Sequence, residues 1–403
     1  MLRPGIVTSP HPDGAAVFAV LGELLARGEA VALATIVGQR GSTPREIGTK
    51  MLVRSNGAIV GTVGGGAAEA EVCRQAAVVL ESGRSQLLTL DFNGTLEQPG
   101  LGICGGSVDV FIESWSSCPP QAAPGPEAVG GAAEVVRAAV GALEEGRPVT
   151  LVTVIDAEGR WAAAAGARIL FGDRGPVSAV TAPEELMAQA ALATVGPRPG
   201  PTAGTWVRTL TAGDGVAQAR VLVEPLRPPE ALLIMGGGHI AQPLAAIATI
   251  CGLAVTVVDD RPGLATPARF PTARAVTADA ASFLAQRLPG AETHVVFVSR
   301  GPAQDMAGLR ALLNSAAGGY VGLIGSERRV WSVLTALRAE GVPAEQLARV
   351  HGPVGLALGG TSPAEIALEI MAEMLGWRHQ STGQERSARL RRRLLTPVAP
   401  ASG

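Results

Sequence analysis

The stretch from Ala231 to Val258 contains no Asp, Glu, Lys or Arg over 28 consecutive residues. A run of that length is long enough for a membrane-spanning helix. However, Gly236 to Gly238 and the pair Gln242-Pro243 interrupt it, and Asp259-Asp260 end it. Consecutive glycines and a proline favour tight turns between buried elements over one continuous helix. We therefore interpret the stretch as a buried strand, a helix and a second strand, and expect no membrane segment.

Short β-branched runs alternate with helical runs through the rest of this region. We expect strands at 232–235, 254–258, 294–299 and 319–324, and helices at about 239–251, 304–316, 327–340 and 363–376. Ser362, Pro363 and Glu365 provide a capping box for the last helix. The alternation predicts βαβ units and a parallel sheet, that is, a Rossmann-like doubly wound fold.

The first 226 residues contain a weak internal repeat. Leu25 to Val37 aligns with Leu143 to Ile155 at an offset of 118 residues with five identities, and Gly48 to Leu52 aligns with Gly166 to Leu170. The repeat predicts two related α/β units. The copies differ where Gly64-Gly65-Gly66 of the first becomes Ala182-Pro183-Glu184 in the second, and Ser42-Thr43-Pro44 likewise becomes Arg160-Trp161-Ala162. We expect any special chemistry of the first copy at these unshared positions.

Pro-rich stretches at 117–130 and 225–229 read as connections between these parts. The expected organisation has an N-terminal α/β domain, a Rossmann-like domain and a basic tail that is a mobile terminus or docks a partner. Their ranges are 1–226 with sub-repeats at about 15–115 and 133–224, then 227–380, then 381–403.

Composition excludes some classes of protein. Lys and Arg total 33 against 35 Asp and Glu, a net charge of −2, so no basic surplus indicates nucleic-acid binding. Cys73, Cys104, Cys118 and Cys251 form no CxxC pair, which argues against a zinc knuckle or a disulfide framework and favours a reducing cytoplasm. Lys50 is the single lysine. Its position either needs a compact point charge or has kept a lysine by chance.

Three loops of the first repeat carry residues suited to an anionic or bulky ligand. They are Ser42, Thr43, Arg45 and Lys50 between two strands; Gly64, Gly65, Gly66 and Glu69 at the start of a helix; and Cys104, Gly105 and Gly106 before a strand. Hydroxyls, cations and glycine backbone can hold an anion. A thiol between glycines is sterically open, as a reactive or metal-binding thiolate requires. Ordinary glycine turns between strands would look similar.

The turn from Gly236 through Gly238 to Ala241 matches the G-x-G-x-x-A pattern between a strand and a helix. Such a turn places backbone N–H groups at a phosphate. Asp259, 23 positions beyond Gly236, or Asp260 would then accept a ribose hydroxyl, which favours NAD over NADP. The alternative is a turn that is merely tight. His239 inside it either contacts the ligand or is bonded to the backbone.

A second strand–glycine–helix junction follows at Gly325 and Ser326, with Arg328 and Arg329 next. It could hold an anion. The alternative is an ordinary serine N-cap followed by solvated arginines.

These residues, in this order, resemble the XdhC/CoxI family. In the first domain the resemblance lies in Gly41-Ser-Thr-Pro-Arg45, Gly48 to Leu52, Gly64 to Gly66 with Glu69, and Cys104-Gly-Gly106; in the second it lies in Gly236 to His239, Val257 to Arg261, Phe270-Pro271, Gly322 to Ser326, Pro353 to Leu356 and Pro363 to Ile366. It covers about residues 15 to 380. The chain departs from the family in Ser299-Arg-Gly-Pro302, where Pro302 replaces a histidine, and in Gly359-Gly-Thr-Ser362, where the family has an acidic stretch.

The resemblance implies an accessory protein rather than an enzyme. Such proteins bind the molybdenum cofactor, protect its terminal sulfur during sulfuration by a cysteine desulfurase, and deliver it to an apo molybdenum hydroxylase of the xanthine dehydrogenase type. A homodimer is also implied. On this reading Cys104 would contact molybdenum or sulfur, Arg45 and Lys50 would supply charge, and the Gly236 loop would hold phosphate. An NAD(P)-dependent oxidoreductase and a nucleotide-sensing regulator are the alternatives, and possibilities for the ligand include NAD(P) or another nucleotide.

Overall fold

The computed structural model describes residues 14–94, 101, 104–116, 131–179, 183–195, 204–228, 230–286, 289–290, 292–313 and 319–381. The chain divides into two compact units, Met1–Pro229 and Glu230–Gly403. The division falls at the end of the Pro-rich stretch 225–229. The stretch 117–130 with Cys118, and the arginine-rich tail beyond Ser381, lie outside the described residues.

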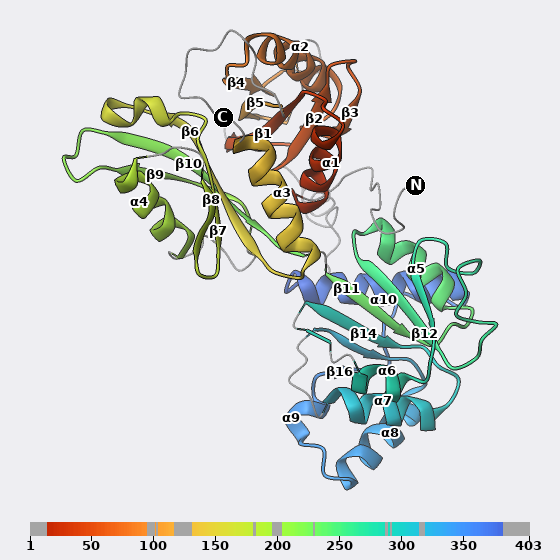
Figure 1. Ribbon diagram of the computed structural model, residues 1–403. Coiled ribbons are helices and arrows are strands. Elements are labelled where there is room, and N and C mark those ends of the chain that lie inside the picture. The colour runs from red at the N-terminus through yellow and green to blue at the C-terminus, as the bar shows by residue number, and fades with distance from the viewer. Residues whose placement is uncertain are drawn as a thin grey trace, which may run out of the picture. The chain divides into compact units, whose positions relative to one another are not determined.

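The first half of the first unit is a five-stranded antiparallel sheet with two helices (Figure 1). Its elements are α1 (Gly14–Ala26), β1 (Val31–Gly41), β2 (Lys50–Arg54), β3 (Ile59–Gly61), α2 (Gly66–Ser82), β4 (Gln86–Asp91) and β5 (Gly106–Trp115). The strand order is β3-β2-β1-β5-β4.

The second half repeats this plan. Its elements are α3 (Gly131–Glu144), β6 (Val149–Ala157), the 3-10 helix η1 (Gly159–Ala164), β7 (Arg168–Gly172), β8 (Gly175–Ala179), α4 (Glu184–Val195), β9 (Trp206–Thr211) and β10 (Gln218–Leu226). The strand order, β8-β7-β6-β10-β9, is the same. Single hydrogen bonds recur as well, since Gly48 N–H donates to the Ile36 carbonyl at 2.8 Å and Gly166 N–H donates to the Val154 carbonyl at 2.8 Å. The predicted repeat is confirmed.

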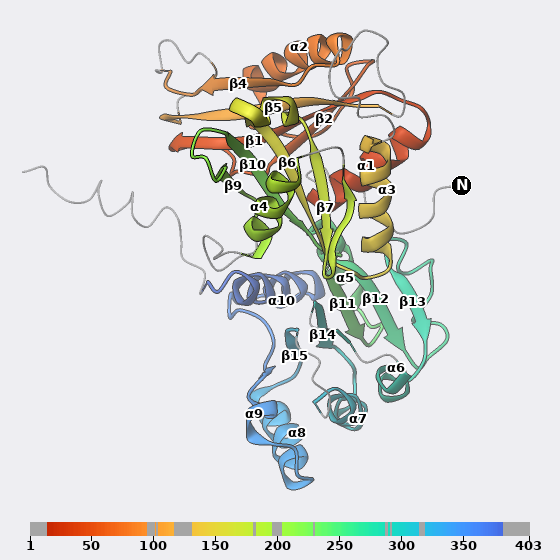
Figure 2. The ribbon, with the colours of Figure 1, turned by 60° about the vertical axis from the view of Figure 1, so that its left-hand side comes forward.

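The two sheets are each buried on both faces. In β1 the alternate residues Ala32, Ala34 and Ile36 pack against α2, whereas Leu33 faces a core shared by both repeats. That shared core contains α1 and α3, which lie side by side (Figures 1 and 2), together with side chains of both sheets such as Leu151. Because side chains alternate along a strand, β1 contributes residues to both cores, and its sequence is therefore a continuous apolar run.

The second unit is a six-stranded parallel sheet with helices on both faces. Its elements are β11 (Ala231–Met235), α5 (Ala241–Ile250), β12 (Ala254–Asp259), β13 (Arg274–Thr277), α6 (Ala280–Gln286), β14 (Thr293–Phe297), α7 (Pro302–Leu313), β15 (Val321–Leu323), α8 (Glu327–Ala339), α9 (Ala344–Leu347), β16 (Val350–His351) and α10 (Pro363–Arg378). The order β13-β12-β11-β14-β15-β16 is that of a Rossmann fold. Helices α5 and α10 pack on one face, and α6, α7 and α8 pack on the other (Figure 2).

The charge-free stretch forms β11, α5 and β12, as expected. No helix of the described residues is long and apolar enough to span a membrane. The predicted capping box of α10 is confirmed, because Glu365 N–H donates to the Ser362 hydroxyl at 3.2 Å and Ser362 N–H donates to the Glu365 carboxylate at 2.9 Å. The sequence did not predict β13, α6, α9 and β16. These have between two and seven residues, too few for a periodic pattern.

Candidate functional site

Two of the three glycine loops of the first repeat touch each other through their backbones. Gly41 at the end of β1 pairs with Gly106 at the start of β5. A Cβ atom on Gly41 would lie 2.5 Å from the Gly105 carbonyl oxygen, and one on Gly106 would lie 2.5 Å from the Ser42 carbonyl oxygen. Only glycine allows this approach, so these glycines bring the Ser42 loop against the residue that follows Cys104.

The third loop joins the same cluster. A Cβ atom on Gly64 would lie 3.1 Å from the Pro44 ring and 3.8 Å from the Phe92 ring. Phe92 in turn pairs with the second loop, since its N–H donates to the Gly106 carbonyl at 2.8 Å. We call Ser42–Pro44, Gly64–Gly66 and Cys104–Gly106 the first-repeat loop cluster. The structure thus unites three motifs that are far apart in the sequence.

The outer glycines of this cluster leave room beside the backbone. Gly65 and Gly66 have φ angles of +88° and +60°, and a Cβ atom on either would meet no atom of the described residues within 4 Å. They begin α2, where N–H groups have no acceptor within the helix. Cys104 is exposed. The cluster therefore presents open backbone and an accessible thiol.

Glu69 holds the Gly64–Gly66 loop in place through hydrogen bonds. The Thr62 hydroxyl donates to its carboxylate, and Gly65 N–H donates to the same carboxylate oxygen at 3.0 Å. Gly64 N–H donates to the Thr62 hydroxyl oxygen at 3.2 Å. The sequence grouped Glu69 with the ligand-binding residues, but the structure gives it a role in positioning the loop.

The two predicted cations of this region have different surroundings. Arg45 is half-buried, and its carbonyl accepts a hydrogen bond from the Thr43 hydroxyl at 3.1 Å. Lys50, by contrast, lies in the core, where its ammonium group pairs with Glu224 and donates to Thr35 at 3.2 Å. The expectation that Lys50 supplies charge to a ligand is wrong, because a buried ammonium group with a carboxylate partner is not available to one.

The other described cysteines differ from Cys104. Cys73 and Cys251 are half-buried, and burial raises the pKa of both thiols. A raised pKa lowers the thiolate fraction and with it the reactivity. Cys73 and Cys251 are therefore less reactive than an ordinary exposed thiol, whereas Cys118 lies outside the described residues.

In the second repeat, ion pairs between side chains join the loops that correspond to the first-repeat loop cluster. Arg160 stands 118 residues after Ser42 and forms ion pairs with Glu185 at the start of α4 and with Asp214 in the β9–β10 turn. Glu185 also accepts from Gly213 N–H at 2.9 Å. Where the first repeat has glycines and Cys104, the second has an ion-pair network that joins the same three loops.

In the second unit, the backbone of neighbouring segments packs closely against the Gly236–Gly238 turn. A Cβ atom on Gly236 would lie 2.9 Å from the Val298 carbonyl oxygen, and one on Gly237 would lie 2.8 Å from the Leu264 carbonyl oxygen. A Cβ atom on Gly238 would meet no atom of the described part of the chain within 4 Å. His239 is exposed, and it forms no hydrogen bond with the described residues. The alternative in which His239 is bonded to the backbone is therefore wrong, and its contact with a ligand stays a prediction.

Asp259 is fully engaged by its own chain. Its Oδ2 accepts from Gly237 N–H at 2.7 Å and from Arg261 Nη2 at 2.8 Å, and its Oδ1 accepts from Arg261 Nε at 2.8 Å. Burial opposes ionisation, but the Arg261 side chain and the two backbone N–H groups of Gly237 and Arg261 outweigh it and lower the pKa of Asp259 to about 2. The expectation that Asp259 receives a ribose hydroxyl is wrong, whereas the exposed Asp260 remains a candidate.

The junction at Gly325 and Ser326 is a helix cap. The Ser326 hydroxyl accepts from Arg329 N–H at 3.3 Å and begins α8. Arg328 is exposed, but the Arg329 guanidinium pairs with the fully buried Asp305 of α7. The serine N-cap is confirmed, whereas the expectation of solvated arginines holds for Arg328 and is wrong for Arg329, whose guanidinium pairs with an internal carboxylate rather than with an anion. Pro302, which replaces the family histidine, begins α7.

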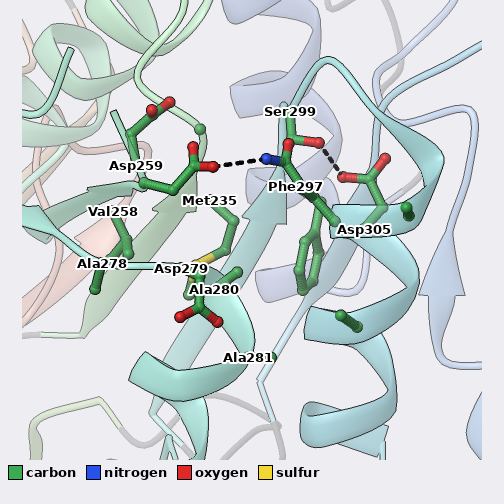
Figure 3. Close-up of a pocket in the computed structure, with 15 residues that line it drawn as sticks. Met235, Val258, Asp259, Ala278, Asp279, Ala280, Ala281, Phe297, Ser299 and Asp305 are labelled. Atoms are coloured by element: carbon green, nitrogen blue, oxygen red, sulfur yellow. Dashed lines mark hydrogen bonds between the residues drawn. The ribbon is translucent and has the colours of Figure 1, made fainter. Parts of the chain in front are cut away.

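A pocket of about 240 Å³ lies at the carboxyl ends of β11, β12 and β14 (Figure 3). Its polar lining includes Asp260, Asp279, Ser299, Gln304 and Asp305. Sequence reasoning missed Asp279, Gln304 and Asp305 as site residues. The signal for them was their place in loops and helix starts after parallel strands, where open α/β sheets bind ligands.

Comparisons with known proteins agree with this architecture. A family model described as the XdhC Rossmann domain matches residues 232–374, and one described as the XdhC and CoxI family matches residues 24–92. The chain is 25% identical over 359 residues to a probable xanthine dehydrogenase subunit of Bacillus subtilis (strain 168), covering 88% of this chain and 96% of that protein.

A second relative is longer than this chain. The chain is 23% identical over 357 residues to the uncharacterized protein YqeB of Escherichia coli (strain K12), which covers 87% of this chain but only 44% of that protein. Among solved structures, a xanthine dehydrogenase from Bacillus halodurans superimposes with a TM-score of 0.70 over 93% of this chain and 99% of that one. At 20% identity this likeness shows the fold alone.

Proposed function

The chain belongs to the XdhC and CoxI family, and from this premise we propose that it is a carrier that binds the molybdenum cofactor, protects its sulfurated form and inserts it into a molybdenum hydroxylase of the xanthine dehydrogenase type. The name of the relative from Bacillus subtilis supports a partner of that type. The proposal includes a cysteine desulfurase as a second partner, a homodimer, a cytoplasmic location and no reaction catalysed by the chain itself.

One observation carries the proposal. The first repeat has an open loop cluster at the place where the second repeat has ion pairs between its own side chains. Both copies share strands, helices and single hydrogen bonds, so the difference between them is local. Arg160 of the second copy ties its loops together, whereas Gly65 and Gly66 of the first leave open space. A structural role alone would not require the first copy to keep an accessible thiol and left-handed glycines beside each other.

The chemistry of the cluster fits this cargo. When bound, the cofactor supplies a phosphate, a dithiolene and an oxidised metal. The N–H groups in the first turn of α2, from Gly66 onward, suit the phosphate, and a soft thiolate such as that of Cys104 suits molybdenum or sulfur. Arg45, the residue after the Ser42–Pro44 loop, adds a positive charge. No group of three or more His, Cys, Asp or Glu in the described part of the chain is arranged to hold a metal ion. We therefore assign one metal contact, Cys104, and leave the other donors to the cofactor.

Within this proposal each residue has a limited task. Glu69 and Thr62 hold the Gly64–Gly66 loop in its left-handed conformation by accepting from Gly65 N–H and Gly64 N–H, which leaves the N–H groups after Gly65, at the start of α2, for a ligand. The backbone contact of Gly41 with Gly105 fixes the distance between the Ser42 loop and Cys104. The thiol can then reach a ligand that the helix start already holds.

The alternative, an NAD(P)-dependent oxidoreductase, has less support in the second unit. Gly236 and Gly237 are explained by internal packing, and Gly237 N–H donates to Asp259 rather than pointing to an open site. Among the described residues, no Arg or Lys lines the pocket beside this turn. A pyrophosphate would therefore meet carboxylates there.

The test is loading and transfer. The purified full chain is mixed with the molybdenum cofactor, separated by gel filtration, and assayed for molybdenum and for the fluorescence of the oxidised pterin. The loaded protein is then added to an apo hydroxylase of the xanthine dehydrogenase type. We expect molybdenum and pterin to co-elute with the protein, and the activity of the apo hydroxylase to return after the loaded protein is added. Co-elution of NAD(P) without any pterin, and no activity after transfer, would support the oxidoreductase instead.

A further inference from the structure

Strand β4 of the first repeat lies at the edge of its sheet. Among the described strands it pairs with β5 alone, at the end of the order β3-β2-β1-β5-β4 (Figure 1). Along an antiparallel strand, the backbone N–H and C=O groups of successive residues point alternately to the two sides. Phe92, directly after β4, donates its N–H to the Gly106 carbonyl at 2.8 Å, which continues the pairing with β5. The backbone groups of Leu87, Thr89 and Asp91 therefore point to the open side.

This edge lacks the features that keep a sheet from pairing further. Proteins protect edge strands by making them short or by placing prolines or charges in them. Of the six edge strands that the structure describes, β3 and β16 have three and two residues, β8 contains Pro176, and β9 and β13 carry the exposed Arg208 and Arg274. β4 has six residues, no proline and no charge before Asp91, its last residue. Leu87 is 44% exposed. β4 is thus suited to accept another strand.

The equivalent strand of the second repeat shows the difference at one position. β9 holds the place of β4 in the order β8-β7-β6-β10-β9. Its third residue is Arg208, which pairs with Val221, whereas the third residue of β4 is Leu88, which pairs with Val110. The charge that blocks further pairing at the edge of the second repeat is therefore replaced by an apolar residue in the first.

The charges beside β4 indicate which strand can pair with it. Arg84, two residues before β4, and Asp91, at its end, are both exposed, and neither forms an ion pair with a described residue. In an antiparallel pair of two β4 strands, Arg84 of each copy lies near Asp91 of the other. In a parallel pair, each charge would meet its like, which is unfavourable. The pattern is thus complementary to a second, antiparallel copy of itself.

We propose that two copies of the chain form a homodimer by antiparallel pairing of their β4 strands about a two-fold axis, which joins the two five-stranded sheets into one. Such an axis keeps equal faces of the two sheets together, so the pairing is centred on one residue. Centring on Leu88 places Ser85 opposite Asp91 of the second copy, with Arg84 beside it. This inference names the interface of the homodimer in the proposed function and rests on that homodimer, but not on cofactor binding.

The size of the contact predicts its strength. Stable interfaces bury about 1,200–2,000 Å² in total, and one pair of six-residue strands is a small part of such an area. The dimer should therefore be in equilibrium with the monomer, and its dissociation constant can be measured in solution.

The test is sedimentation velocity of the purified full chain, from low micromolar to submillimolar concentration. We expect a dimer whose fraction rises with concentration. Leu87→Lys adds a charge at the open edge and should raise the dissociation constant at least about tenfold. Val177→Lys, on the proline-containing edge strand β8, is the matched control, because Val177 is 51% exposed. It should leave the dissociation constant unchanged.

A charge exchange tests the antiparallel arrangement. Arg84→Asp and Asp91→Arg each place like charges at both ends of the paired strands, and each should weaken its own dimer by about threefold or more. A mixture of the two variants restores opposite charges at both ends. We therefore expect the mixture to form heterodimers in preference to either homodimer, as measured by native mass spectrometry. Asp91→Arg also removes a hydrogen bond from Asn93 N–H, so thermal melting should confirm that both variants fold.

The possible results separate the interface from the homodimer. A chain that stays monomeric at every concentration would overturn both, while the loading assay would still decide cofactor binding. A dimer that Leu87→Lys leaves intact would support the homodimer and overturn β4 as its interface. A mixture of the charge variants without a preference for heterodimers would overturn the antiparallel pairing.

Discussion

Lys50 of β2 and Glu224 of β10 form an ion pair across the two repeats, and only 2% and 4% of their side-chain surfaces are exposed. The reciprocal pair joins Arg168 of β7 to Glu113 of β5, with a distance of 3.0 Å from Nε to Oε2. Lys50 and Arg168 are 118 residues apart, which is the repeat offset. Each repeat thus contributes one cation and one carboxylate, and each pairs with the other repeat.

The aromatic neighbours account for the choice of cation. The Cζ atom of Arg168 lies 4.0 Å from the centre of the Trp115 ring, a distance at which a planar guanidinium stacks. The Nζ atom of Lys50 lies 5.8 Å from the centre of the Phe18 ring and donates to Thr35 instead. The one lysine of the chain therefore occupies a site that needs a compact charge.

Removing one member of the Lys50–Glu224 pair should be strongly destabilising. Lys50→Met leaves a buried carboxylate without its partner and should lower the free energy of unfolding of the first unit by about 3–5 kcal/mol. Adding Glu224→Leu to the same chain should recover most of that loss. Denaturant unfolding of the two variants and the parent measures both effects.

The control for this experiment is Arg27→Ala, which breaks the exposed pair with Glu23 and should change stability by less than about 1 kcal/mol. Equal losses of stability for Lys50→Met and for the double variant would show that the unpaired Glu224 carboxylate is not the cause of the loss.

Substituting Gly106 should damage the loop cluster directly. In Gly106→Ala the new methyl group would lie 2.4 Å from the Arg40 carbonyl oxygen, so the Ser42 loop must move away. We expect at least a tenfold loss of cofactor affinity, measured by pterin fluorescence after gel filtration. Gly141→Ala in α3 is the matched control, because its added methyl meets nothing within 4 Å and should leave affinity unchanged. Normal binding by Gly106→Ala would mean that the loop spacing is unimportant.

Opening the second repeat should not affect the cargo. Arg160→Ala removes the ion pairs with Glu185 and Asp214, all of them at the surface. Exposed ion pairs contribute little, so the melting temperature should change only slightly. Cofactor binding should be the same as in the parent chain. A drop in binding would assign the cargo to both repeats.

The second unit should lose stability in acid through Asp259. Its pKa is about 2 in the folded protein against 3.8 for the free side chain, so it contributes stability above about pH 4 that is lost as the pH falls toward 2. Because Arg261 is 34% exposed, solvent screens the pair and we expect about 1–2 kcal/mol. Asp259→Asn should therefore be less stable than the parent at pH 7 and equally stable near pH 2. A gap that stays constant with pH would contradict this assignment.

Some of this arrangement was predictable from the sequence. The Rossmann elements follow from long apolar runs separated by glycine, and the repeat follows from five identities at one offset. The convergence of Ser42, Gly64 and Cys104 follows less directly, because the second copy marks only Ser42 and Gly64 as special, and Cys104 is marked only by the glycines after it.

Other features could not be predicted, for a physical reason. The partner of Lys50 lies in a strand at the far end of the other repeat, and no local pattern encodes a contact between such distant residues. Asp259 fits the ribose-binding position in sequence, but its two oxygens are taken by Arg261 and a glycine N–H, which only the folded turn reveals. Sequence patterns locate acceptors without showing which of them are already occupied.

The most direct test of the central claim is the molybdenum and pterin content of Cys104→Ala after loading and gel filtration, with Cys73→Ala as the matched control. The thiol of Cys104 is exposed and sits in the first-repeat loop cluster, whereas that of Cys73 is half-buried in α2. We predict that Cys104→Ala folds normally and retains little cofactor, while Cys73→Ala retains as much as the parent chain. Full retention by Cys104→Ala would contradict the assignment of this cluster as the cofactor site.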